Sequence, residues 1–145
     1  MMAMTSEQVL RAIGEAILCV DSHGRIFYAN PAAAQLVGGV AEELIGSVLH
    51  ERLHPAKRDG KRCTRADCPL YLTLRDGAAH RMSGESFVKK DGTSFPVEYV
   101  STPLKQGDAV AGAVFVARDI SEQNMLAIQL LQAQKLESIG QLAAG

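Results

Sequence analysis

The sequence predicts an α+β domain built on one five-stranded antiparallel sheet, with short helices gathered on one face of that sheet. Two segments with strand character precede a group of short helical segments, and three longer strand segments follow the group. Turn sequences join the first two strands and the last three, so antiparallel pairing is the expected arrangement. The 145 residues suffice for one such domain with a helix at each end.

The N-terminal part predicts a lead-in helix and a β-hairpin. Residues 6–13 place apolar side chains at helical spacing, and Ser6 is expected to cap this helix. Residues 16–20 and 25–29 are rich in β-forming side chains, and Asp-Ser-His-Gly lies between them as a turn sequence. These two segments should therefore form the first two strands.

The middle of the chain predicts short helices. Asn30 can cap a helix whose first turn accepts the proline that follows it, and a glycine pair should end this helix. A second helix is expected at 41–45, and residues 47–67 should form a short helix followed by a polar loop. Pro69 can then open another helix that ends at an Asp-Gly pair.

Three strands are expected at roughly residues 80–89, 94–104 and 110–118. Lys-Asp-Gly-Thr joins the first two, and Lys-Gln-Gly-Asp joins the last two. Both connections contain residue types that favour tight turns, which supports a meander of three antiparallel strands. A last helix should begin at about Ser121.

Composition limits the classes of function. Basic and acidic side chains nearly balance, at 15 and 16, so a nucleic-acid partner is not expected. No apolar run approaches the ~20 residues of a membrane-spanning helix, and no signal peptide is recognisable, so this segment should not contact a membrane. Three cysteines are too few for a disulfide scaffold, which indicates a reducing compartment and a cytoplasmic location.

Four segments in order resemble the PAS sensor domain family across about residues 14–123. They are A-I-L-C-V-D-S-H-G-R-I-F-Y-A-N-P-A-A-A-Q-L, E-E-L-I-G, F-V-K-K-D-G-T-S-F-P-V-E and G-A-V-F-V-A-R-D-I-S-E-Q. The resemblance implies the PAS fold, in which a five-stranded antiparallel sheet bends around a cavity that the short helices close. This agrees with the fold expected from the residues themselves.

The tail L-L-Q-A-Q-K-L-E-S-I-G-Q-L-A-A-G is similar to the start of the dimerisation and phosphoacceptor domain of bacterial two-component sensor histidine kinases. The resemblance implies a lead-in helix at 1–13, a PAS domain at 14–120 and a signalling helix at 121–145. It places the phosphorylated histidine and the ATP-binding domain outside these residues, so the chain itself is not expected to be an enzyme. Its parent is expected to be a histidine protein kinase, which can also carry a membrane anchor upstream.

The signalling helix carries a stripe of apolar residues. The stripe follows spacings of four, three, three and three, which is an imperfect heptad, through Leu126, Leu130, Ala133, Leu136 and Ile139. Two copies of such a helix should pair as a coiled coil, and the alternative is that the helix packs on its own domain. The expected partners are a second copy, through both the PAS domain and this helix, and the kinase domains of the same parent chain.

Asp119 and Ser121 lie where the last strand passes into this helix. In the PAS family the matching aspartate helps to tie the sheet to the outgoing helix, so the resemblance assigns Asp119 a part in signal transmission. By residue type alone, either Asp119 or Ser121 is a good N-cap, worth roughly 1 kcal/mol of helix stability.

The polar loop holds the residues of a candidate zinc site, namely His50, His54, Cys63 and Cys68. The two histidines stand one helical turn apart, and the two thiolates would complete a tetrahedral set. The alternative is that the histidines lie exposed at a helix end and that Cys68 is a small core residue before Pro69. A redox disulfide between Cys63 and Cys68 is a further hypothesis.

Tyr71, Met82 and Phe115 are expected to line the wall of a pocket for a small, apolar or weakly polar ligand, and a packed cavity is the alternative. The resemblance argues against flavin, because the Asn-Cys-Arg type of motif is missing. It argues against haem too, because the helix before Asp76-Gly77 contains no axial histidine. No cofactor is assigned, and zinc or an unidentified small ligand remains open.

Three functions follow from these patterns. The first is a sensory input domain that relays a signal through its C-terminal helix to a histidine kinase core. The second is a ligand-free PAS module for dimerisation or protein interaction, and the third is a metal or redox sensor that uses the His and Cys loop. Thiol catalysis by Cys68 with His54 would need an oxyanion hole, for which the sequence provides no evidence.

Overall fold

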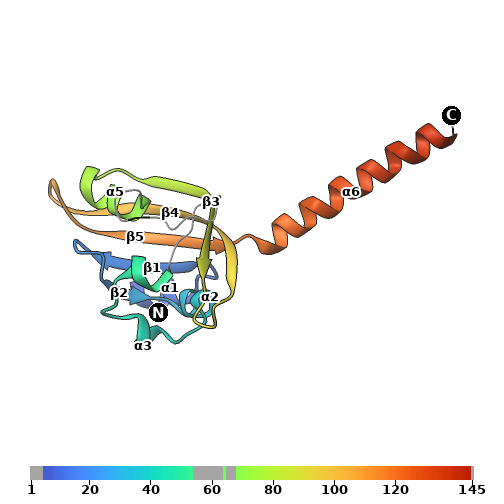
Figure 1. Ribbon diagram of the computed structural model, residues 1–145. Helices are drawn as coiled ribbons and strands as arrows, with labels where there is room; N and C mark the ends of the chain where they lie inside the picture. The colour runs from blue at the N-terminus through green and yellow to red at the C-terminus, as the bar shows by residue number, and fades with distance from the viewer. Residues whose placement is uncertain (1–4, 54–63, 65–67, 145) are drawn as a thin grey trace, which may run out of the picture.

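The computed structural model describes residues 5–53, 64 and 68–144. Its centre is a five-stranded antiparallel sheet with the strand order β2-β1-β5-β4-β3 (Figure 1). The α+β fold class expected from the sequence is confirmed, and the first and last strands pair at the centre of the sheet. The strands are β1 Ala16–Asp21, β2 Ile26–Ala29, β3 His80–Val88, β4 Ser94–Gln106 and β5 Ala109–Asp119.

Short helices cover one face of the sheet, and a long helix leaves it (Figure 1). The first helix is α1 Ser6–Ala12, and the long one is α6 Ser121–Ala144. In the part of the chain that the structure describes, no helix is both long and apolar enough to cross a membrane. The helices between β2 and β3 are α2 Pro31–Val37, α3 Ala41–Leu44, α4 Leu49–Leu53 and α5 Pro69–Asp76.

The core lies between the sheet and α2 to α5. Side chains alternate along β4, so that Val97, Tyr99 and Ser101 are buried on the inner face. On β3 the alternation breaks at Gly84, which has a φ of 91° and lies where the pairing with β4 shifts register. A bulge of this kind turns the following side chain to the other face, and Glu85 is accordingly buried.

Asn30 joins three elements at the edge of this core. Its side-chain oxygen accepts hydrogen bonds from the backbone N–H groups of Ile17 and Ala33, both at 2.9 Å. The residue is fully buried, so the side chain caps α2 and also holds the start of β1. Its amide nitrogen donates to the backbone carbonyl oxygens of Leu10 in α1 and of Ile13 and Glu15 between α1 and β1.

Two local expectations were wrong. Thr5, and not Ser6, caps α1, because Thr5 and Gln8 form a reciprocal capping box that leaves Ser6 inside the helix. The last two strands also run further than expected, since Gln106 and Ala109 still pair across the turn. Only Gly107 and Asp108 remain between the strands, and the positive φ of Gly107, 63°, suits such a tight turn.

Candidate functional site

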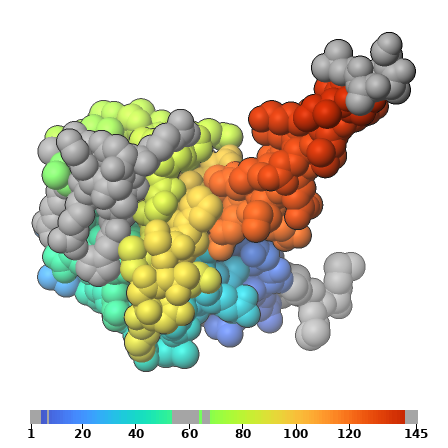
Figure 2. Space-filling model, turned by 45° about the vertical axis from the view of Figure 1, so that its right-hand side comes forward, coloured from blue at the N-terminus to red at the C-terminus, as the bar shows by residue number. Residues whose placement is uncertain are grey.

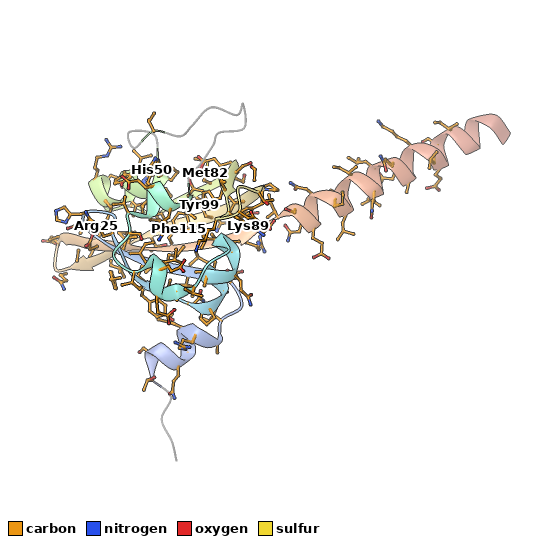
Figure 3. All side chains as sticks on the ribbon, turned by 60° about the horizontal axis from the view of Figure 1, so that its bottom comes forward. Arg25, His50, Met82, Lys89, Tyr99 and Phe115 are labelled. Atoms are coloured by element: carbon orange, nitrogen blue, oxygen red, sulfur yellow. The ribbon has the colours of Figure 1, made fainter. Side chains whose placement is uncertain are left out.

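The predicted pocket wall belongs to one packed core. Tyr71 on α5 and Met82 on β3 are half-buried and pack against the core that contains Phe115 on β5. The Phe115 ring centroid lies 4.5 Å from that of Tyr99 and 6.0 Å from that of Phe87. Figure 3 shows Met82, Tyr99 and Phe115 on neighbouring strands. Three aromatic rings therefore occupy this part of the inner face, and the binding of a ligand there stays a prediction.

A buried hydrogen bond lies within the aromatic group that Phe87, Tyr99 and Phe115 form. The Tyr99 hydroxyl donates to a carboxylate oxygen of Glu85 at 2.7 Å, and both side chains are less than 10% exposed, at 2% and 6%. Two residues along β4, the Ser101 hydroxyl is also buried, and none of the described residues forms a hydrogen bond with it. Buried polar groups are costly unless they are paired, so these groups mark the chemically distinctive part of the inner face.

Sequence reasoning missed Glu85. A carboxylate in the middle of a strand is normally read as facing solvent, and the simple alternation from Met82 would place residue 85 outside. The available signal was Gly84, because an isolated glycine inside a strand often marks a bulge. The positive φ of Gly84 is the conformation that turns Glu85 inward.

The structure describes two of the four candidate zinc ligands. His50 on α4 is half-buried, and its ring meets the edge of Tyr71 at a centroid distance of 5.7 Å. Cys68 is buried directly before α5. His54 and Cys63 lie outside the described residues, so the zinc and disulfide hypotheses stay predictions. Residues 5–53, 64 and 68–144 by themselves hold no group of three or more side chains placed to bind a metal.

The junction between β5 and α6 is closely hydrogen-bonded. One Asp119 carboxylate oxygen accepts from the backbone N–H of Ser121 at 2.8 Å and from its hydroxyl at 2.6 Å. Ile120 directly precedes the helix, so Asp119 supplies the cap from one position earlier than a standard N-cap. The Ile120 N–H donates to the Pro96 carbonyl on β4 at 3.1 Å. The first turn of α6 is thus tied to two neighbouring strands.

The remainder of α6 is exposed to solvent. All residues from Ser121 to Gly140 are exposed, and Figure 2 shows the helix standing clear of the domain. The alternative of a helix packed on its own domain is therefore not what the structure shows. Apolar residues outside the predicted stripe are exposed too, and sequence reasoning missed them because it followed a single face. They are Met125, Ile128 and Leu131, with 51–59% of their surface accessible.

Comparison with known proteins agrees with this architecture. The family model described as "PAS domain" matches residues 14–122. The Escherichia coli protein named "Probable diguanylate cyclase DgcE" is 30% identical over 138 residues, which is 92% of this chain and 12% of the relative. Two-component system protein A of Emericella nidulans is 35% identical over 109 residues, which is 74% of this chain and 15% of the relative.

The signal transduction histidine-protein kinase AtoS of Escherichia coli is 23% identical over 143 residues, covering 97% of this chain and 22% of the relative. The chain thus spans less than a quarter of the length of these curated relatives. Among solved structures, the PAS domain of nitrogen regulation protein NR(II) from Vibrio parahaemolyticus is 24% identical with a TM-score of 0.64. That match covers 81% of this chain and all of the other, and at this identity it shows the fold alone.

The family match and the sheet topology lead to the same result. The matched residues 14–122 run from the start of β1, through all five strands, into the first turn of α6. The relatives include a protein named as a probable diguanylate cyclase and one named as a signal transduction histidine-protein kinase, and the coarse function that the family match supports is signalling. The chain belongs to the PAS domain family, a family of sensory rather than catalytic domains.

Proposed function

We propose that this chain is the sensory input domain of a histidine kinase and that it relays a signal through α6 to the kinase core. The observation that carries the proposal is the junction at the start of an otherwise exposed helix. There Asp119 accepts hydrogen bonds from Ser121, and the Ile120 N–H donates to the Pro96 carbonyl oxygen. A helix fixed at one end and free along its length transmits any displacement of that end. The similarity to AtoS and the tail sequence support a kinase as the output.

The route of the signal runs along β5. This strand carries Phe115 in the aromatic group, pairs with β1 and β4 on either side, and ends at Asp119. Packed aromatic side chains resist small continuous deformation, so a change at the inner face is expected to shift β5 and β4 together. Because Ile120 bonds to β4, the direction in which α6 leaves would change with the two strands.

The proposed partner of α6 is the same helix of a second copy. Most of the stability of a protein helix comes from packing of its apolar face, and the exposed leucines and isoleucines of α6 would gain that stability by burial against another helix. The apolar residues of the stripe follow one another at spacings of four, three, three, three and four residues up to Ala143. Their mean spacing is therefore shorter than the 3.5 residues of a heptad repeat. A pair of such helices would be locally overwound, which favours two alternative arrangements of similar energy.

The rotational phase of α6, meaning the direction in which its apolar stripe faces, provides the test. The chain is joined through α6 to the phosphoacceptor and ATP-binding domains of a histidine kinase, and autophosphorylation is measured with labelled ATP. Insertion of seven residues after Gln134 preserves the phase of a coiled coil and should keep the activity, whereas insertion of two residues rotates the helix by about 200° and should change it about tenfold or more. Equal activity of the two insertions would contradict a relay through α6.

A second candidate output is a nucleotide cyclase, which the 30% identity to the Escherichia coli cyclase favours. The same insertions are made in a fusion of the chain to a diguanylate cyclase domain, and cyclase activity is measured. Only the type of output domain that the parent protein carries should change its activity when α6 is rotated. A ligand-free module is the remaining alternative, and the ring packing around Phe115 favours it. Mass spectrometry of ligands extracted from the purified chain, with elemental analysis for zinc, separates a sensor with a bound group from an empty module.

A further inference from the structure

A charged hollow lies on the surface beside the end of β3. It has a volume of about 220 Å³ and opens where α2, α3 and α4 meet the end of β3. The buried side chains of Val37 and Leu44 form part of its lining. Four charged residues complete it, namely Glu43, Arg52, Lys89 and Lys90.

Two of these charges neutralise each other. The Lys90 ammonium lies 2.9 Å from a carboxylate oxygen of Glu43 and donates a hydrogen bond to it. This hydrogen bond is the main reason that the pKa of the Glu43 carboxyl lies below its usual value. Arg52 and Lys89 remain, so the lining carries two positive charges in excess. Among the described residues neither forms an ion pair with an acidic side chain, although the Glu43 carboxylate also interacts with Arg52 and the Asp91 carboxylate with Lys89.

Arg52 is already held in position. Its Nε donates to the Ser47 hydroxyl at 3.1 Å, and its Nη2 donates to the Glu43 carbonyl oxygen at 2.8 Å. A guanidinium group has five N–H donors, so three of them remain for a ligand. Because the side chain is already ordered, less conformational entropy is lost when a ligand binds.

Lys89 faces the hollow from the strand side. Its Nζ lies 5.3 Å from the centroid of the Phe95 ring, a cation–π contact that orients the ammonium group without neutralising it. The residue also pairs with Thr93 through its backbone, and Lys90 donates its backbone N–H to the Val37 carbonyl. Both walls of the hollow are thus anchored by backbone hydrogen bonds, and Figure 3 shows Lys89 at the end of β3.

We propose that this hollow binds a small dianion, either a phosphate or a dicarboxylate, between the Arg52 guanidinium and the Lys89 ammonium. Charge-assisted hydrogen bonds from a fixed guanidinium suit the oxygens of both groups. The volume lies below the ~300–1,000 Å³ of sites for drug-sized ligands, which fits a small metabolite or an inorganic ion. The site is independent of the proposed relay, and it would join α3 and α4 to the β3–β4 hairpin.

Isothermal titration of the whole chain with inorganic phosphate, and separately with succinate, tests the proposal against sodium chloride of matched ionic strength. At least one of the two dianions should bind saturably while chloride does not, and the better one identifies the ligand class. Arg52→Gln and Lys89→Gln should each weaken binding about tenfold or more, because each removes a charge-assisted hydrogen bond. Lys105→Gln, at an exposed lysine near the far end of β4, should leave binding unchanged.

Two results would overturn the proposal. One is that neither dianion saturates the chain, or that chloride reproduces the heat. The other is saturable binding that Lys89→Gln leaves unchanged. Arg52 also donates hydrogen bonds to Ser47 and Glu43, so its substitution can affect the fold. The Arg52→Gln binding result therefore counts only if the thermal unfolding midpoint of the variant equals that of the wild-type chain. Among the described residues, the Lys89 side chain donates no hydrogen bond, so the Lys89→Gln variant should keep the fold and decide the question alone.

Discussion

The surroundings of Asn30 and the exposed length of α6 differ in whether their groups find partners within the chain. Around Asn30, one side chain satisfies five backbone groups and is completely buried. Along α6, leucine and isoleucine side chains are 51–61% exposed from Ile128 to Leu131 and 61–70% exposed at Leu136 and Ile139. The first region completes its interactions within the chain, and the second leaves them for another molecule.

This difference separates a part that maintains the fold from a part that carries the output. Changes near Asn30 should therefore act on the stability of the domain, whereas changes along α6 should act on association with little effect on the domain. The junction at Asp119 lies between the two and should affect both to a smaller extent. Substitutions at the three places should therefore rank in the same order.

Asn30→Ala should have the largest effect. It removes the cap of α2 and leaves buried backbone groups without partners, among them the N–H of Ile17. A lost cap costs about 1 kcal/mol, and each unsatisfied buried group costs about 1–3 kcal/mol, so the free energy of unfolding should fall by about 3 kcal/mol or more. Urea denaturation followed by circular dichroism measures this change.

Asn30→Asp is the matched control for that substitution. Aspartate keeps the oxygen that accepts from Ile17 and Ala33 but loses the amide that donates to three carbonyl groups. Because it also brings a buried charge next to those carbonyl oxygens, it too should be destabilising, although α2 keeps its cap. If both variants unfold like the wild-type chain, Asn30 is not the joint between α1, β1 and α2.

Gly112→Ala should have the next largest effect. Gly112 pairs with Asp21 across β1 and β5, and a Cβ atom there would clash with the Val20 carbonyl oxygen. The central pair of strands must move apart to accept it, at a cost of about 1–3 kcal/mol. Gly14→Ala is the control, because a Cβ atom there meets nothing within 4 Å. Equal unfolding midpoints for the two variants would contradict the close approach of β1 and β5.

Asp119→Ala should have a smaller and more local effect. It removes the acceptor for the Ser121 N–H and hydroxyl, worth about 1 kcal/mol to the first turn of α6. Hydrogen exchange at residues 121–124 should therefore quicken, while the strands keep their protection. Autophosphorylation of the fused kinase should change more than the stability of the domain does. An equal loss of signal and of domain stability would assign Asp119 a capping role alone.

Sequence reasoning recovered the parts of this fold that depend on local chemistry. Turn residues, β-forming side chains and the Asn30-Pro31 helix start indicated all five strands and the helix after the second one, because each signal lies within a few residues of its effect. The burial of Glu85 was missed because it depends on a register shift against β4. The hollow was missed because Arg52 and Lys89 are far apart in the chain and meet only when the hairpin folds back.

The central claim is that α6 pairs with a second copy while the domain folds without that pairing. Sedimentation equilibrium of the chain and of Leu130→Lys/Leu136→Lys measures this directly, with Ser138→Lys as a control off the stripe. We expect a dimer whose dissociation constant rises roughly a hundredfold or more in the double variant, with an unchanged unfolding midpoint of the domain. A dissociation constant that stays the same in the double variant would contradict the claim, as would a domain that unfolds with it.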